Sequence, residues 1–558
     1  MRLGVYPEDC LSARWSPLEV RDLPPHPAYV GGMVSFRFRF FVFLLAAAIS
    51  FKTVHAQTAT TAGLRLPALI SDHMVLQNGK ATTLWGWSTP NTAIKAEFLD
   101  TKGKVLATAS GIAPPEGRWM LRLPALPAAT AGTLRITGGM AVKTIQDVVA
   151  GEVWLAGGQS NMTYNLGHKL PPELKDTTMQ DVTAANGAIR FFNVDTNWAT
   201  APNDDVKGHW FIVTGSNYQQ CSAVAWNFAV ALREKIHAPA GMIVSAVGGT
   251  SVTLWMPKAA LDSCPPGPDI EQKMTKNVAD TNEKIKQSAL DDAAWLKLYP
   301  TPELQAQNIK TRPRKYGPAH SFSELYNGMI HGLEPYTVKG VIWFQADGDM
   351  GICFAYGDLI KSMIKAWRAA WGEELPFYYV EMNNMREFPP KTPAQSNDSL
   401  SIIRQQQQAA LELPQTDVAC SIDLGLLEPE PHFPNKKPVG QRLALLAFNN
   451  VYGMPCAAHS PAYESSKVEG NKIRLHFKYA EGLRVRGGGE AIGFEIRGAD
   501  GHWVWATAKV DGEEMLVWND EIPNPTEVHY GWSMNPLISM ENGAGLPMRP
   551  FSTVMIKP

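Results

Sequence analysis

The chain has 558 residues, and at roughly 100–200 residues per domain this length predicts about three or four domains. Its formal net charge is -2 at pH 7. Such a balance provides no basic surplus for binding nucleic acid and no acidic tail, so we expect no nucleic-acid partner.

Residues 1–56 are predicted to be a leader, in which residues 33–56 form a signal peptide. A short basic region precedes an apolar run at 40–51, which is too short for a comfortable membrane span. A small-x-small cleavage site ends at Ala56. We therefore expect cleavage after Ala56 and export to the periplasm or the cell exterior, with no stable membrane span left.

Both ends of the remaining chain, residues 64–147 and 451–558, consist of short strand-like runs separated by glycine and proline turns. Closely spaced short strands of this kind predict an N-terminal β-sandwich domain and a second, C-terminal β-domain of similar architecture. The strands expected there are 82–87, 93–99, 133–137, 472–477, 491–496, 503–506 and 515–518.

Residues 148–450 instead alternate apolar strands with longer helical segments, which predicts an α/β domain with a mostly parallel, doubly wound sheet. A polar stretch at about 270–296 reads as an inserted surface helix or a lid. The expected strands are 152–156, 189–194, 242–247, 340–345, 377–382 and 418–422, and the expected helices are 223–236, 356–371, 403–413 and 436–449.

The first strand of this region ends at a glycine pair followed by Gln159, Ser160 and Asn161. Open α/β sheets bind ligands at the carboxyl ends of their strands, so a serine placed there is a candidate nucleophile. Serine and asparagine are also ordinary helix N-caps, and these residues alone favour neither reading over the other.

A serine hydroxyl is a weak nucleophile and needs an adjacent base, normally a histidine oriented by a carboxylate. His432 is the candidate base, because it lies between prolines on a loop that follows a strand and precedes a helix. Glu430 is the first choice for the orienting carboxylate, Glu428 the second and Asp423 the third.

Two further loops follow predicted strands and are candidates for an oxyanion site. In the loop at 247–250, the missing Cβ of Gly248 and Gly249 lets a backbone N–H approach a ligand. The loop at 343–349 carries Gln345 and Asp349. Either loop alone is weak evidence for an active site. Together with the Ser160 turn and the His432 loop, they make four such segments at strand ends of one sheet, which is stronger evidence.

Taken together, these segments resemble the sialate O-acetylesterase family of the SGNH hydrolases, and similar segments extend over nearly everything after the leader. The resemblance implies a flavodoxin-like SGNH catalytic domain flanked by the two β-domains. The segments that carry it are 158–162, 248–250 with Trp255, 343–345, His432 with 435–436, 440–444, 69–77, 325–330, 530–532 and 542–547.

The resemblance implies an esterase that removes O-acetyl groups from sugars without a metal or an organic cofactor. It makes Ser160 the nucleophile and His432 the general base, with backbone donors to the oxyanion from Ser160 and Gly249. Gln159, Gly248 and Thr250 would contact the substrate. The six cysteines of the sequence are scattered without a CxxC motif, which argues against a zinc site but leaves one or two disulfides open.

Two positions depart from the family pattern. Asp349 stands where the family usually has an asparagine whose amide points at the oxyanion, and a protonated Asp349 or Gln345 remains a possible donor. Glu430 stands where the family usually has an aspartate. A sialate O-acetylesterase-like activity on an O-acetylated glycan is therefore the prediction, with two alternatives. One is an esterase acting on acetylated xylan or other hemicellulose, and the other is a catalytically impaired glycan-binding protein.

Overall fold

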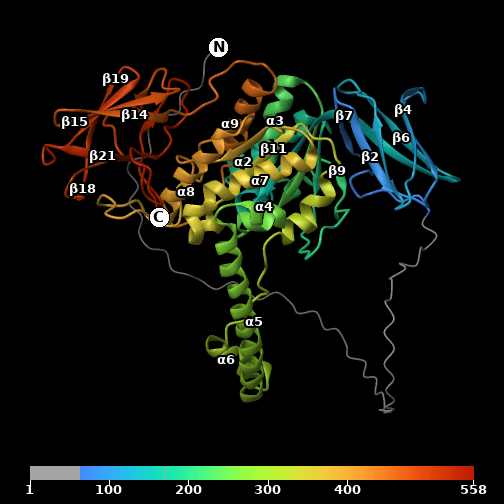
Figure 1. Ribbon diagram of the computed structural model, residues 1–558, viewed down its shortest axis with the longest axis horizontal. Helices are drawn as coiled ribbons and strands as arrows, with labels where there is room; N and C mark the ends of the chain where they lie inside the picture. Colours follow the sequence, from blue (N-terminus) through green and yellow to red (C-terminus); the bar gives the residue numbers. More distant parts are fainter. Residues whose placement is uncertain (1–62, 169, 558) are drawn as a thin grey trace. The chain divides into compact units, whose positions relative to one another are not determined.

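The structure is a computed structural model that describes residues 63–168 and 170–557, so the predicted leader lies outside the described residues. A mostly parallel sheet with helices around it forms the centre of this part of the chain, and antiparallel β-structure precedes and follows it (Figure 1). The prediction of a mixed α/β protein with a central, mostly parallel sheet is confirmed.

The central sheet has the strand order β13-β12-β11-β7-β10-β8-β9. All neighbours pair in parallel except β8 and β9, so the carboxyl ends of the other strands meet at one edge. The strands are β7 (Ala141–Gly158), β8 (Ile189–Asn193), β9 (Trp210–Ile212), β10 (Ala240–Ala246), β11 (Gly340–Phe344), β12 (Phe377–Val380) and β13 (Thr416–Ala419).

The predicted helices at 223–236 and 356–371 are confirmed with the same bounds. The first starts where the Ser222 hydroxyl accepts from the Ala225 N–H, and the second stops at Gly372, whose φ is +64°. The α-helices are α1 (Ser160–Thr163), α2 (Pro172–Ala185), α3 (Ala223–Ile236), α4 (Lys258–Ser263), α5 (Gly267–Leu298), α6 (Pro302–Gln307), α7 (Tyr356–Trp371), α8 (Ser399–Gln407) and α9 (Lys437–Asn450). The 3₁₀- and π-helical segments are η1 (Tyr218–Gln220), η2 (Val252–Trp255), η3 (Ile309–Thr311), η4 (Tyr326–Ile330), η5 (His331–Leu333), η6 (Asp347–Ala355) and η7 (Gln408–Glu412).

One strand, β7, belongs to both the N-terminal β-structure and the central sheet. Its first half pairs with β6 and β1, and its second half lies between β10 and β11. The domain boundary expected between residues 147 and 148 therefore falls inside a continuous strand. The other N-terminal strands are β1 (Val75–Gln77), β2 (Thr82–Trp87), β3 (Ala93–Asp100), β4 (Val105–Ile112), β5 (Arg118–Leu123) and β6 (Ala131–Gly138).

The C-terminal region contains two four-stranded antiparallel sheets, ordered β14-β15-β20-β19 and β18-β17-β21-β23, and the pair β16-β22. Alternate side chains of these strands, such as Leu475 and Val517, are buried in a separate apolar core. The strands are β14 (Ala462–Glu469), β15 (Lys472–Lys478), β16 (Arg484–Val485), β17 (Phe494–Gly498), β18 (Trp503–Trp505), β19 (Thr507–Asp511), β20 (Glu514–Trp518), β21 (Pro525–Tyr530), β22 (Met540–Glu541) and β23 (Phe551–Ser552).

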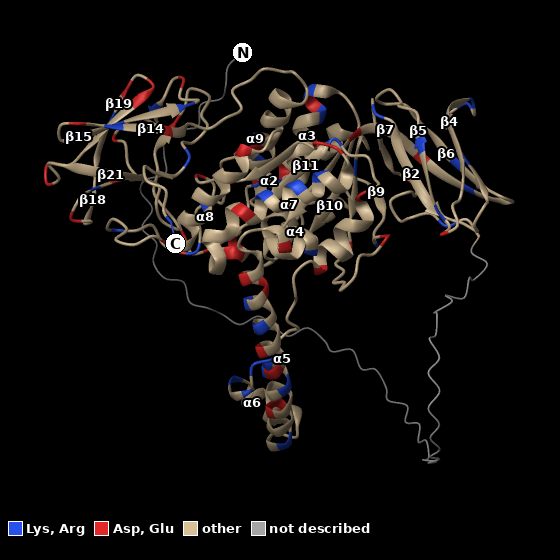
Figure 2. Cartoon of the chain, in the orientation of Figure 1, with Lys and Arg blue, Asp and Glu red and all other residues tan. Residues whose placement is uncertain are grey.

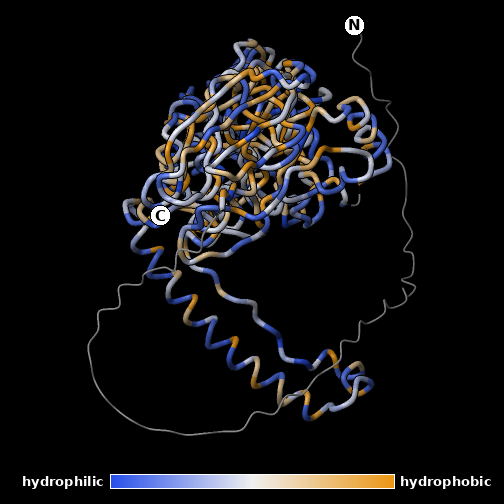
Figure 3. The backbone as a smooth tube through the Cα atoms, turned by 90° about the vertical axis from the view of Figure 1, so that its right-hand side faces the viewer, coloured by the Kyte–Doolittle hydropathy of each residue, from blue (hydrophilic) through white to orange (hydrophobic). Residues whose placement is uncertain are grey.

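Helix α5 carries the polar stretch that the sequence places at 270–296. It extends away from the central sheet in two orthogonal views, and polar and apolar residues alternate along it (Figures 1 and 3). Lysines and carboxylates are interspersed over its length (Figure 2). Within residues 63–168 and 170–557 every helix is too short or too polar to cross a membrane, and the five cysteines of this part of the chain are free.

A buried ion pair joins the C-terminal segment to the central sheet. Arg549 donates to Glu381 Oε1 from Nε at 3.0 Å and from Nη2 at 2.8 Å. The side chain of Glu381 is 0% exposed and that of Arg549 is 7% exposed, so each charge depends on the other.

We expect Arg549→Ala to lower the free energy of unfolding by about 3–5 kcal/mol, because it leaves the Glu381 carboxylate buried without its cation. Lys286→Ala removes the exposed pair with Glu283 and should cost about 0–1 kcal/mol. Urea unfolding followed by circular dichroism measures both changes. Equal midpoints for the two variants would contradict this account of the ion pair.

Candidate active site

The turn that carries Ser160 is fixed by two glycines packed against β11. A Cβ on Gly157 would lie 2.7 Å from the Trp343 ring, and one on Gly158, whose φ is +139°, would collide with the Phe344 carbonyl. The Gln159 N–H donates to that same carbonyl at 2.9 Å. The chain therefore leaves the sheet at a defined point, and Ser160 begins α1 partly exposed at the carboxyl edge.

The loop after β10 lies directly beside the serine. A Cβ on Gly248 would be 3.3 Å from Ser160 Cβ, and Gly249, with φ of +72°, has open space beside it. The backbone N–H groups of Ser160 and Gly249 donate no hydrogen bond within the described residues, nor does the Ser160 hydroxyl. Two backbone donors and a hydroxyl are thus left free where the two loops meet.

Among the three carboxylates considered for His432, Glu430 is the one that contacts the histidine. Its Oε1 lies 3.1 Å from His432 Nδ1 and accepts from the His432 backbone N–H at 2.8 Å. Glu428 is exposed and its carboxylate has no hydrogen bond in the described part of the chain. Asp423 instead pairs with Arg442 and Arg486. Burial alone would raise the pKa of Asp423, but the two arginines outweigh it, so the net effect is a lowered pKa.

The histidine loop is tied to the residue next to the serine. Asn161 Nδ2 donates to the Pro431 carbonyl at 3.3 Å, and the Lys436 ammonium donates to Asn161 Oδ1. Lys436 is 1% exposed and its Nζ lies 3.4 Å from the centre of the Phe433 ring. No hydrogen bond joins Ser160 to His432 within residues 63–168 and 170–557, but these contacts bring their two loops together.

Burial lowers the pKa of Lys436 well below its ordinary value, while the nearby Glu430 acts in the opposite direction. Neither Asn161 nor Lys436 was among the sequence-predicted site residues. The available signal was position at the start of a helix: Asn161 directly follows Ser160, and Lys436 comes four residues after His432.

Gln345 and Asp349, both expected as oxyanion donors, have other partners. The Gln345 amide donates to the Thr250 carbonyl at 2.9 Å and to Asp349 Oδ2 at 2.6 Å, which uses both of its hydrogens. Asp349 also accepts from the Val252 N–H at 2.9 Å and from the Ser251 hydroxyl. Both side chains therefore hold the loop beside Ser160. Burial raises the pKa of Asp349 to about 6, against these donors.

The side chains expected to contact substrate are partly engaged within the protein. Gln159 Oε1 accepts from the Gly348 N–H at 3.3 Å, while its Nε2 is buried without a partner in the described residues. The Thr250 hydroxyl donates to the Val247 carbonyl at 2.7 Å and accepts from Trp255 Nε1 at 3.0 Å, so this side chain is engaged within the protein. Arg386, absent from the sequence prediction, pairs with Asp347 at 2.7 Å, one residue from Gly348.

Comparison with known proteins gives a consistent result. The family model described as "Carbohydrate esterase, sialic acid-specific acetylesterase" matches residues 150–289 and 311–449. The sialate O-acetylesterase of Mus musculus is 24% identical over 523 residues, which cover 85% of this chain and 90% of the mouse protein. The human sialate O-acetylesterase is 24% identical over 518 residues, covering 85% of this chain and 88% of the human protein.

A solved structure is similar along nearly the whole described chain. The crystal structure of a carbohydrate acetylesterase from Xanthomonas citri superposes with a TM-score of 0.72 at 32% sequence identity. The match covers 88% of this chain and 100% of the Xanthomonas protein.

The buried Asp349 carboxylate should make stability depend on pH. Its pKa rises from 3.8 in the unfolded chain to about 6 when folded, so it costs stability as pH rises through this window. We expect Asp349→Asn to be more stable than the wild type above pH 6, by up to about 3 kcal/mol, and to lose the advantage below pH 4. Urea unfolding from pH 4 to 8 measures this, and the exposed Asp520→Asn should show no such trend.

Proposed function

Since the chain belongs to the carbohydrate esterase family of sialic acid-specific acetylesterases, we propose that it hydrolyses sugar O-acetyl esters with Ser160 as nucleophile. Membership of this family makes the protein a carboxylic ester hydrolase. The observation that carries the serine mechanism is the contact of Glu430 with His432 Nδ1 on a loop tied, through Asn161, to the serine turn.

In the proposed reaction, the Ser160 hydroxyl attacks the acetyl carbonyl while His432 Nε2 accepts its proton. Glu430 holds the proton on Nδ1, which keeps Nε2 in the acceptor form, and stabilises the imidazolium. When the tetrahedral intermediate collapses, the bond between the acyl carbon and the sugar oxygen breaks. The imidazolium protonates that oxygen, and the sugar leaves with a free hydroxyl group. A water molecule deprotonated by His432 then hydrolyses the acetyl-enzyme to acetate.

The free backbone N–H groups of Ser160 and Gly249 are proposed as the oxyanion donors. They need no side chain, so the proposal does not require the residue at position 349 to donate to the oxyanion. Asp349 and Gln345 do not contact the oxyanion in this proposal. They hydrogen-bond to the backbone at 250–252 and so fix the direction of the neighbouring Gly249 N–H. A donor held in place before the reaction stabilises the developing charge without reorganisation.

We also propose the finer architecture that accompanies this mechanism. Residues 148–450 form an SGNH-type, flavodoxin-like catalytic domain, and residues 64–147 and 451–558 form the flanking β-domains. The support for it is the parallel order of β7, β10, β11, β12 and β13, with the serine turn at the end of the central strand. Export through the predicted leader is part of the same proposal.

The substrate is proposed to be an O-acetylated sugar, with sialic acid favoured by the relatives named above. Acetylated xylan remains the alternative with the same mechanism. Acetate release from an O-acetylated sialic acid and from acetylated xylan, measured side by side with one enzyme preparation, decides between them.

Ser160→Ala and His432→Ala should each lower kcat on 4-nitrophenyl acetate by at least about 10³-fold, because they remove the nucleophile and its base. Both positions are partly exposed, so circular dichroism should show an intact fold. Equal rates for the wild type and Ser160→Ala would reject the serine mechanism and favour a glycan-binding protein without esterase activity.

Glu430→Gln should lower kcat by about 10²-fold, less than the roughly 10⁴-fold effect of a buried triad aspartate, because water can partly replace it. The side chain of Glu430 is 48% exposed, which gives water that access. Glu428→Gln is the matched control two residues away, and its rate should stay within about twofold of the wild type. A larger loss for Glu428→Gln than for Glu430→Gln would reassign the orienting carboxylate.

A further inference from the structure

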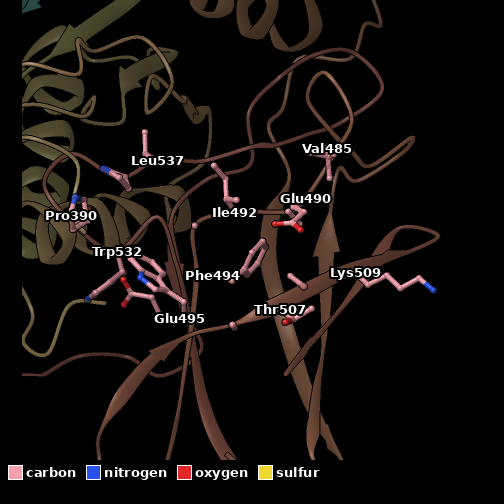
Figure 4. A pocket seen from close by; sticks show the side chains of 18 of the residues that line it. Pro390, Val485, Glu490, Ile492, Phe494, Glu495, Thr507, Lys509, Trp532 and Leu537 are labelled. Atoms are coloured by element: carbon pink, nitrogen blue, oxygen red, sulfur yellow. The ribbon is translucent and has the colours of Figure 1, made fainter. Parts of the chain in front are cut away.

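The C-terminal β-region contains a hollow of about 850 Å³ that none of the active-site loops lines. Its walls come from strands β16, β17, β18, β19 and β20 and from the loops around residues 390, 490 and 535. Figure 4 shows Phe494 in the middle, with Trp532 and Glu495 to one side and Thr507 and Lys509 to the other.

Large apolar side chains gather at this hollow although water reaches them. Trp505 is 40% exposed, Ile492 43% and Leu537 47%, and all three line it together with the buried Phe494. Single exposed apolar residues are normal on a protein surface, but several around one concavity mark a binding site. The indole of Trp505 offers a flat apolar face on which another ring can pack.

Two buried polar groups of the hollow are incompletely satisfied. Glu495 is 2% exposed; its Oε1 accepts from the Ala394 N–H at 3.3 Å, whereas its Oε2 has no hydrogen bond in the described residues and lies 3.8 Å from His529 Nδ1. Ser533 is 8% exposed and its hydroxyl also has no partner there. Buried polar atoms of folded proteins nearly always have partners, so two exceptions among the residues that line one hollow point to a ligand with hydroxyl groups.

We propose that this hollow is a non-catalytic subsite for a neutral, pyranose-based oligosaccharide. A pyranose ring presents an apolar C–H face, which fits Trp505, and hydroxyl groups at its edge, which can donate to Glu495 and pair with Ser533. A purely apolar ligand would leave both polar groups unsatisfied. The carboxylates of Glu490 and Glu495 are balanced by Lys391 and Lys509, so the lining has no net charge and favours a neutral sugar.

Such a subsite extends the proposed esterase function without taking part in the chemistry. No residue of the Ser160 or His432 loops lines the hollow, so a bound glycan is retained on the enzyme and not cleaved there. A glycan held at this hollow keeps its own acetyl groups close to the enzyme, which raises their effective concentration at the catalytic serine.

The test measures binding in the Ser160→Ala background, where hydrolysis does not interfere, by calorimetry with xylohexaose, cellohexaose, mannohexaose and 3'-sialyllactose. We expect at least one neutral hexasaccharide to bind, and Trp505→Ala to weaken that binding at least about tenfold, or about 1.4 kcal/mol. Glu495→Gln should weaken it at least about threefold. Leu537→Glu should also weaken binding at least about threefold, and because Leu537 is exposed the substitution should not disturb the core.

Val468→Ala is the matched control, because Val468 is 55% exposed in the same region and does not line the hollow. It should leave binding unchanged. Failure of all three neutral sugars to bind, binding of 3'-sialyllactose alone, or equal affinity with and without Trp505 and Leu537 overturns the proposal. Each outcome is independent of whether Ser160 is the nucleophile, since no turnover is measured.

Discussion

The close contact between the ends of β7 and β11 is the constraint on which the site depends. Gly157 and Gly158 have no side chain to hold the strands apart, and Gln159 is hydrogen-bonded to the carbonyl of Phe344. Any larger residue at either glycine would push the serine turn off the sheet edge. The position of Ser160 is therefore set by backbone packing in the middle of the sheet, where the surroundings are close-packed and rigid.

Around this fixed turn, polar side chains hold the neighbouring loops and leave the reacting groups free. Gln345 and Asp349 fasten the backbone at 250–252, and Asn161 with Lys436 fastens the histidine loop. Their hydrogen bonds are satisfied within the protein, which gives each loop one defined geometry. The Ser160 hydroxyl and the N–H groups of Ser160 and Gly249 have no partner within the described residues, so they are free to meet the substrate, as a preorganised site requires.

The sequence was informative wherever the local pattern decides the structure. Helices α3 and α7 have the predicted bounds, because their caps and apolar spacing are local signals. The continuity of β7 was not predicted. The boundary expected at 147/148 lies where short strands separated by turns give way to strands alternating with helices, and this change falls inside one strand, where its burial begins. The partners of Gln345 and Asp349 were also missed, because the residue type does not tell where an amide or a carboxylate points. Glu430 was ranked first, yet only the fold shows its distance to the imidazole.

The far end of helix α5 lies outside the two parts of the chain that the family model matches. The segment between the two parts matched by the family, residues 290–310, covers the end of α5, α6 and the start of η3. This segment lies at neither the serine turn nor the histidine loop, so changes in its length leave the strand order and the serine turn intact. Residues 290–310 are therefore separate from the groups proposed for the chemistry. This separation makes the segment a natural place to fuse a label or an affinity handle.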